Sequence, residues 1–90
     1  MAKEGKVQSL TLDVLIPHRP NIVEFGNSIS GDDGIESVDV SVYAMDEKTQ
    51  SLKVVLTGRE IKIEQISKHI EQFGGVIHSI DKVLISKEQQ

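Results

Sequence analysis

LTLDVLI, the stretch Leu10–Ile16, decides the fold, because its apolar residues alternate along one face. A period of two residues is typical of a half-buried β-strand. Pro17 ends this strand, since proline cannot donate to a hydrogen-bond ladder. Pro20 then suits the first turn of a helix, and apolar residues at spacings of three and four predict that helix over Ile22–Ser30. This part of the chain therefore predicts a strand followed by an amphipathic helix.

The same kinds of element come again further along the chain. Alternating apolar residues predict one strand from Ile35 to Ala44 and another over Leu52–Leu56, joined by a polar connection of hairpin length. The apolar stripe within Ile63–Phe73 predicts a second helix. Gly74 and Gly75 end this helix, because glycine adopts the left-handed cap at little cost.

A last apolar segment, Val76–Ile85, predicts a fourth strand with less regular alternation. A bulge would let Ile80 and Val83 both point inward, so the parity of this strand stays open. With right-handed crossovers, this order of elements predicts an α+β, ferredoxin-like βαββαβ sandwich: a four-stranded antiparallel sheet with two helices on one face. The expected strand order is fourth, first, third, second. The predicted core is Leu10, Leu12, Val14, Ile22, Phe25, Ile29, Val38, Val40, Val42, Leu52, Val54, Leu56, Ile63, Ile66, Ile70 and Phe73.

Length and composition limit the class of protein. Ninety residues predict a single domain over 7–86, with flexible polar tails at 1–6 and 87–90. The absence of cysteine excludes disulfides, thiolate metal sites and cysteine nucleophiles. A net charge of −4 argues against a nucleic-acid partner, and the absence of a long apolar run argues against a membrane span. We expect a cytoplasmic protein without nucleic-acid or membrane partners.

Three functions known for this fold need residues that the chain lacks. RNA-recognition domains stack bases on aromatic side chains, and the third predicted strand has none. Metallochaperones of this fold use two cysteines in the loop after the first strand. Acylphosphatase-type enzymes hold phosphate with an arginine at the same loop, where Arg19 stands, but the glycine-rich cradle before it is missing. Asp32 and Asp33 are interpreted as turn residues, and His69 as a residue at the solvated boundary of the second helix.

One polar cluster is expected at the end of the sheet where the first strand meets the first helix. The topology brings to this rim His18, Arg19, Asp46, Glu47, Gly74, Gly75 and His78. Of these, His18, Arg19 and His78 are candidate ligand-binding residues, and no residue is assigned as catalytic. The carboxylates of Asp46 and Glu47 together with the imidazoles of His18 and His78 would suit a divalent metal ion. The alternative is an ordinary solvated loop edge.

Four segments carry a resemblance to a known family: Leu12–His18, Val38–Val42, Asp46–Thr49 and Gly74–Val83. Together they resemble a family of small archaeal proteins known only as a domain of unknown function, with a ferredoxin-like fold. The resemblance covers nearly the whole chain, from Val7 to Ile85. It implies the fold, an archaeal cytoplasm and a tendency to form homo-oligomers, but no activity. At Ile16 the family typically has lysine, so a rim charge is missing here.

The leading functional hypothesis is a non-enzymatic homo-oligomer that binds a small ligand or metal ion at the rim or between subunits. The sheet face opposite the helices is expected to form the interface, because it mixes apolar residues such as Leu15, Tyr43 and Val55 with few charges. The second strand, an edge of the sheet, also lacks the proline and lysine that commonly protect edges. The alternative is a small hydrolase or transferase acting on an anionic substrate at His18, Arg19 and His78.

Overall fold

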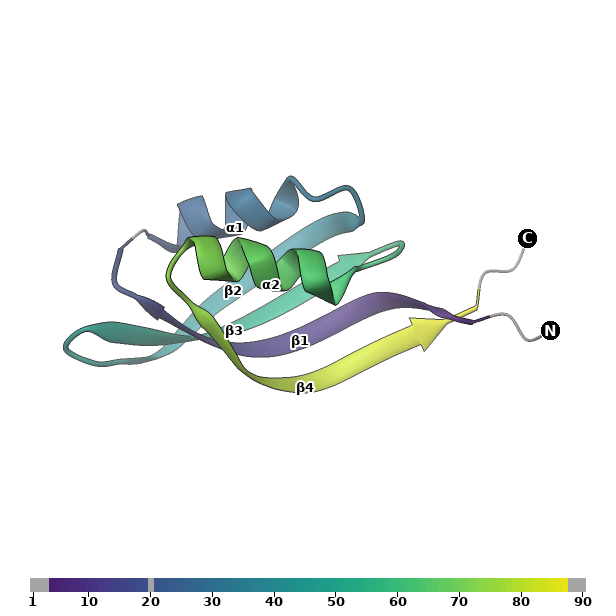
Figure 1. Ribbon diagram of the computed structural model, residues 1–90. Coiled ribbons are helices and arrows are strands. Elements are labelled where there is room, and N and C mark those ends of the chain that lie inside the picture. The colour runs from purple at the N-terminus through teal and green to yellow at the C-terminus, as the bar shows by residue number, and fades with distance from the viewer. Residues whose placement is uncertain (1–3, 20, 88–90) are drawn as a thin grey trace.

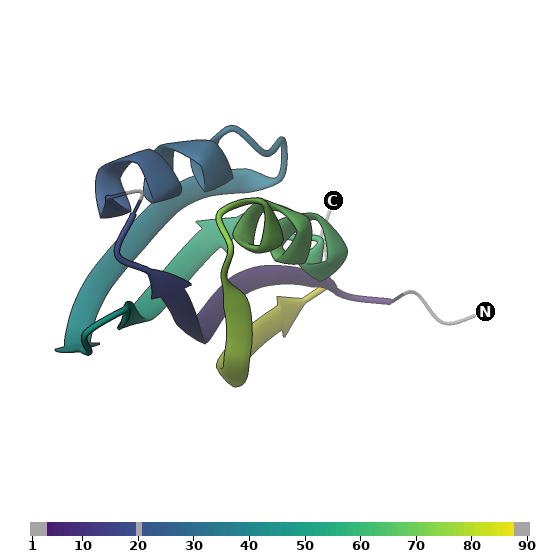
Figure 2. The ribbon, with the colours of Figure 1, turned by 60° about the vertical axis from the view of Figure 1, so that its left-hand side comes forward.

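The computed structural model describes residues 4–19 and 21–87 and confirms the ferredoxin-like α+β fold (Figure 1). The elements follow in the predicted order: β1 (Lys6–Pro17), α1 (Ile22–Ser30), β2 (Ile35–Met45), β3 (Thr49–Gly58), α2 (Ile63–Gln72) and β4 (Val76–Ser86). The sheet order is β2-β3-β1-β4, and all neighbouring strands are antiparallel. This is the predicted order. Both helices cover one face of the sheet, and the other is called the open face below (Figure 2).

Two element boundaries differ from those predicted. Strand β1 begins at Lys6, whose partner on β4 is Ser86, so it starts one residue inside the segment expected to be a tail. Helix α1 begins at Ile22, and the side chain of Asn21 caps it by accepting hydrogen bonds from the backbone N–H groups of Val23 and Glu24. Pro20, expected in the first turn, lies outside the described residues.

The core lies between the sheet and the helices. Its fully buried members on the central strands are Leu10, Leu12, Val14, Ile16, Leu52, Val54 and Leu56. The helices contribute Phe25, Ile29, Ile66 and Ile70, and Ile61 closes the core before α2. The rings of Phe25 and Phe73 meet edge to face at 5.6 Å between their centroids. Of the predicted core, Ile22, Val38, Val40, Ile63 and Phe73 are only partly buried.

Val42 was predicted in the core, and this prediction is wrong. Its side chain is 38% exposed, because the β2–β3 hairpin extends beyond the region that α1 covers (Figure 1). The opposite end of the molecule shows the same feature, where the start of β1 and the end of β4 form a second uncovered ribbon (Figure 1). The molecule is accordingly elongated, with principal extents of 50 × 22 × 17 Å.

Strand β4 contains the irregularity that left its parity open. Its register against β1 shifts at His78 and again at Asp81, so each of these residues is an extra residue in the ladder. Both Ile80 and Val83 consequently pair with inward-facing residues of β1, namely Leu12 and Leu10. The bulge that would turn both residues to the helix side is confirmed. They nevertheless remain about half exposed, because β4 is an edge strand.

No helix within 4–19 or 21–87 is long and apolar enough to cross a membrane.

Candidate functional site

The predicted rim brings His18 into contact with the β2–β3 hairpin. Nε2 of His18 lies 2.7 Å from the carbonyl oxygen of Asp46 and 3.1 Å from that of Thr49. Because carbonyl oxygens only accept hydrogen bonds, Nε2 carries the proton and donates it to the hairpin backbone. The carboxylate of Asp46 accepts a hydrogen bond from the backbone N–H of Glu47, at 2.9 Å. The imidazole thus fastens the end of β1 to the hairpin through its backbone.

The other rim residues lie around this contact without forming one cluster of side chains. Arg19 is exposed, and Gly74 packs beside Pro17 with a φ of 77°. Gly75 contacts Ile16 closely enough that a Cβ would collide with its side chain. His78 is an exposed bulge residue of β4. In the described part of the chain, no three His, Asp or Glu side chains lie close enough together to hold a metal ion.

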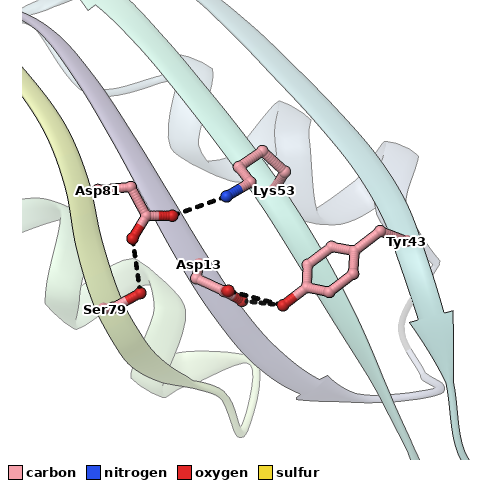
Figure 3. A network of polar contacts seen from close by, with 5 residues as sticks. All are labelled: Asp13, Tyr43, Lys53, Ser79 and Asp81. Carbon is pink, nitrogen blue, oxygen red and sulfur yellow. Dashed lines mark hydrogen bonds and ion pairs between the residues drawn. The ribbon is translucent and has the colours of Figure 1, made fainter.

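The open face carries a polar network that the sequence analysis missed (Figure 3). We call it the face network: Asp13, Tyr43, Lys53, Ser79 and Asp81. The hydroxyl of Tyr43 lies 2.6 Å from both carboxylate oxygens of Asp13. Nζ of Lys53 donates to Asp81 at 2.7 Å, and the hydroxyl of Ser79 donates to the other oxygen of that carboxylate at 2.8 Å. Nζ of Lys53 also lies 5.9 Å from the centre of the Tyr43 ring.

The network shifts the protonation equilibria of three of its members. The hydrogen bond to Asp13 raises the pKa of Tyr43. The hydrogen bonds from Lys53 and then Ser79 lower the pKa of Asp81, while the same contact with Asp81 raises the pKa of Lys53. Each shift favours the protonation state that the network needs. The charged groups of the open face are therefore satisfied within one subunit.

The apolar surface lies at the outer edges of the sheet rather than on the open face. Leu15 and Val55, expected to form an apolar interface on that face, are only partly exposed. The exposed large apolar residues on β4 are Val76, Ile80, Val83, Leu84 and Ile85, and those on β2 are Val42, Tyr43 and Met45. Both strands are edges. The alternating sequence could have suggested this surface only if the bulges and the reach of the helices had been known.

A groove adjoins the β4 edge on the helix side. It has a volume of about 400 Å³ and lies between the start of β1, the start of α2 and β4. Ile80 and Val83 line it together with Val7, Leu10 and Ile63. The apolar edge of β4 therefore continues into an apolar hollow.

A second cavity lies between the turn after α1 and the start of α2. Its volume is about 680 Å³, and its lining includes Asp32, Asp33, Arg59, Lys62 and His69. His69 is partly buried there, with Nδ1 3.2 Å from the hydroxyl of Ser28 and Nε2 3.7 Å from Asp32. His69 and Asp32 thus connect α2 to α1 and the turn that follows it, which is more than the boundary and turn roles predicted for them.

Two comparisons with known proteins agree with the resemblance seen in the sequence. The family model DUF211, described as uncharacterized ArCR, matches residues 8–89. Uncharacterized protein MJ0319 of Methanocaldococcus jannaschii is 34% identical over 82 residues, which cover 91% of this chain and 84% of that protein.

Proposed function

The chain belongs to the uncharacterized family DUF211, and from this premise we propose that it is a non-enzymatic module that assembles with copies of itself through the outer edges of its sheet. The observation that carries the proposal is the exposed apolar row on β4. Its five residues are each between 47% and 57% exposed, although they occupy one edge strand. Isolated exposed apolar residues are ordinary, but a continuous row along an edge is typical of an interaction surface.

The backbone of the edges supports the same proposal. An edge strand presents unpaired N–H and C=O groups, which natural proteins commonly protect with proline or lysine. Strand β2 has neither residue in its eleven positions, and β4 has one lysine in eleven. A domain of this size also buries only about 60–65% of its unfolded surface, so association would add burial that a single subunit lacks.

The enzymatic alternative has less support in the contacts of the rim. Its central residue, His18, donates Nε2–H to the hairpin carbonyls, a contact that orders the loop. His78 lies on β4, where it adds a minor contribution to the lowered pKa of Asp81, after the hydrogen bonds from Lys53 and Ser79. Both contacts are explained by the stability of the subunit.

Light scattering after gel filtration at micromolar concentration tests the proposal. We expect a mass several times the 9.9 kDa of one chain, and a mass of one chain would overturn self-assembly. Ile80→Asp should reduce the mass, because it places a charge in the exposed row. Val23→Asp is the matched control, since Val23 is 67% exposed on α1, away from both edges, and its substitution should leave the mass unchanged.

A further inference from the structure

The two outer edges of the sheet are complementary to each other. Resting on the self-assembly proposed above, we propose that β4 of one subunit pairs with β2 of the next subunit in an antiparallel, head-to-tail arrangement. The occupant of the β4 edge is then a second copy of this chain, and the occupant of its β2 edge is a third.

The direction of the strands allows this pairing. Because all neighbours in the order β2-β3-β1-β4 are antiparallel, β2 and β4 run in opposite directions. A second subunit placed beside β4 in the same orientation therefore continues the antiparallel alternation. In a regular sheet of an even number of strands, the residues whose backbone groups point outward lie on the same face at both edges. The hydrogen-bonding groups of the two edges are consequently in phase.

The charges of the edges favour β4 against β2 over either edge against itself. Strand β2 carries Glu36 and Asp39 and no basic residue. Strand β4 carries Lys82, and its one acidic residue, Asp81, is already paired with Lys53 of the same subunit. Pairing of β2 with β2 would bring acidic residues together, which is unfavourable. Pairing of β4 with β2 brings Lys82 to an acidic edge.

The register within the subunit shows how the side chains would meet. Strand β4 already pairs Val83, Lys82 and Ile80 with Leu10, Thr11 and Leu12 of β1, alternating between the helix side and the open face. The segment Val38–Val40 of β2 has the same alternation, with both valines on the helix side and Asp39 on the open face. Placed in this register, Val38 and Val40 of the next subunit meet Val83 and Ile80.

Asp39 of the next subunit then lies directly opposite Lys82. Further along, Val42 and Tyr43 of that subunit meet Ile77 and Val76, which extends the apolar contact toward the hairpin. A slip of one residue would turn Asp39 to the apolar helix side, so one register is strongly preferred.

A charge exchange tests this pairing. Lys82→Glu and Asp39→Lys should each raise the concentration at which half of the assembly dissociates, by about tenfold or more, because like charges would then face each other at every contact. The double variant should recover the assembly of the unmodified protein. Lys68→Glu, the same change of charge on an exposed residue of α2, is the control, and circular dichroism confirms that every variant folds.

Mixing the two single variants separates the head-to-tail arrangement from the others. Where β4 of the first variant meets β2 of the second, the introduced glutamate would face the introduced lysine. At the next contact, the unchanged Lys82 of the second variant would face the unchanged Asp39 of the first. The mixture should therefore assemble where each variant alone does not.

The other arrangements predict different results. Pairing of β4 with itself, or packing of the open faces, predicts no recovery in the mixture. An assembled wild type that is insensitive to both substitutions overturns this pairing alone, whereas a wild type with the mass of one chain overturns self-assembly as well.

Discussion

The hydroxyl of Tyr43 on β2 reaches across β3 to the carboxylate of Asp13 on β1, with 2.6 Å to each oxygen. Beside it, Lys53 on β3 reaches across β1 to Asp81 on β4. The two contacts join all four strands on the face that the helices leave uncovered (Figure 3). Because the charges of the open face are satisfied by one another, the exposed apolar surface is left to the edges of the sheet.

The Tyr43–Asp13 contact can be measured directly, because Tyr43 is the only tyrosine in the chain. The hydrogen bond to Asp13 raises the pKa of Tyr43 above its ordinary value of 10.0. We expect Asp13→Asn to shift the midpoint of the tyrosinate absorbance titration to lower pH, while Asp33→Asn, at the far turn, leaves it unchanged. Because the folded-state pKa is raised, the contact stabilises the fold below pH 10 and this stabilisation is lost as the pH rises through the raised value. Equal midpoints in the two variants would contradict the contact.

The Lys53–Asp81 pair should contribute to stability over a defined range of pH. The pKa of Asp81 is lowered from 3.8, so its contribution is present above that value and is lost as the pH falls through the lowered pKa. The pKa of Lys53 is raised from 10.5, so its contribution is present below that value and is lost as the pH rises through the raised pKa. In urea unfolding, the difference between wild type and Lys53→Met should therefore be largest near neutral pH and shrink at both extremes.

Salt and a control variant check the origin of that difference. Because the pair is partly exposed, high salt should reduce the effect of Lys53→Met. Lys48→Met, in the exposed hairpin, should show no such dependence on pH. A difference that stays constant from acid to alkaline pH would mean that Lys53 acts through packing alone.

The elements of the fold could be predicted because they depend on local patterns. The alternation in Leu10–Ile16 and the helical stripe in Ile63–Phe73 each bury one face, whatever their partners are. The exposure of Val42 could not be predicted in this way, since it depends on where α1 ends relative to the hairpin. The face of each β4 residue was equally inaccessible, because two bulges shift the register of that strand.

The candidate sites were harder to predict, because side-chain pairing depends on register. Topology correctly placed His18 near the hairpin, but its partners are backbone carbonyls, which no residue pattern indicates. Asp13, Tyr43 and Lys53 each fit the pattern of a solvent-facing strand residue. Only the register, which sets these side chains diagonally across one face, reveals that they pair.

The central core should tolerate truncation poorly. Leu12 is fully buried between the sheet and the helices, so Leu12→Ala should lower the free energy of unfolding by about 2–5 kcal/mol. Val23→Ala, at a residue 67% exposed, should change it by less than about 0.5 kcal/mol. Urea denaturation at one fixed protein concentration gives both values. A neutral Leu12→Ala would show that β1 is assigned to the wrong face.

A pair of glycine substitutions tests the close approach of two segments at the end of β3. Gly58 pairs with Ile35 at the start of β2, and a Cβ on Gly58 would collide with the carbonyl group of Gly34. The obstacle is backbone, and Arg59 N–H also donates to that carbonyl, so the segment cannot move away without losing a hydrogen bond. We expect Gly58→Ala to cost about 1–3 kcal/mol of stability. At Gly31, with φ −75°, a Cβ would have an ordinary contact of 3.5 Å, so Gly31→Ala should be neutral or stabilising by up to about 1 kcal/mol. If both substitutions proved equally mild in urea denaturation, the close approach of Gly34 and Gly58 would be contradicted.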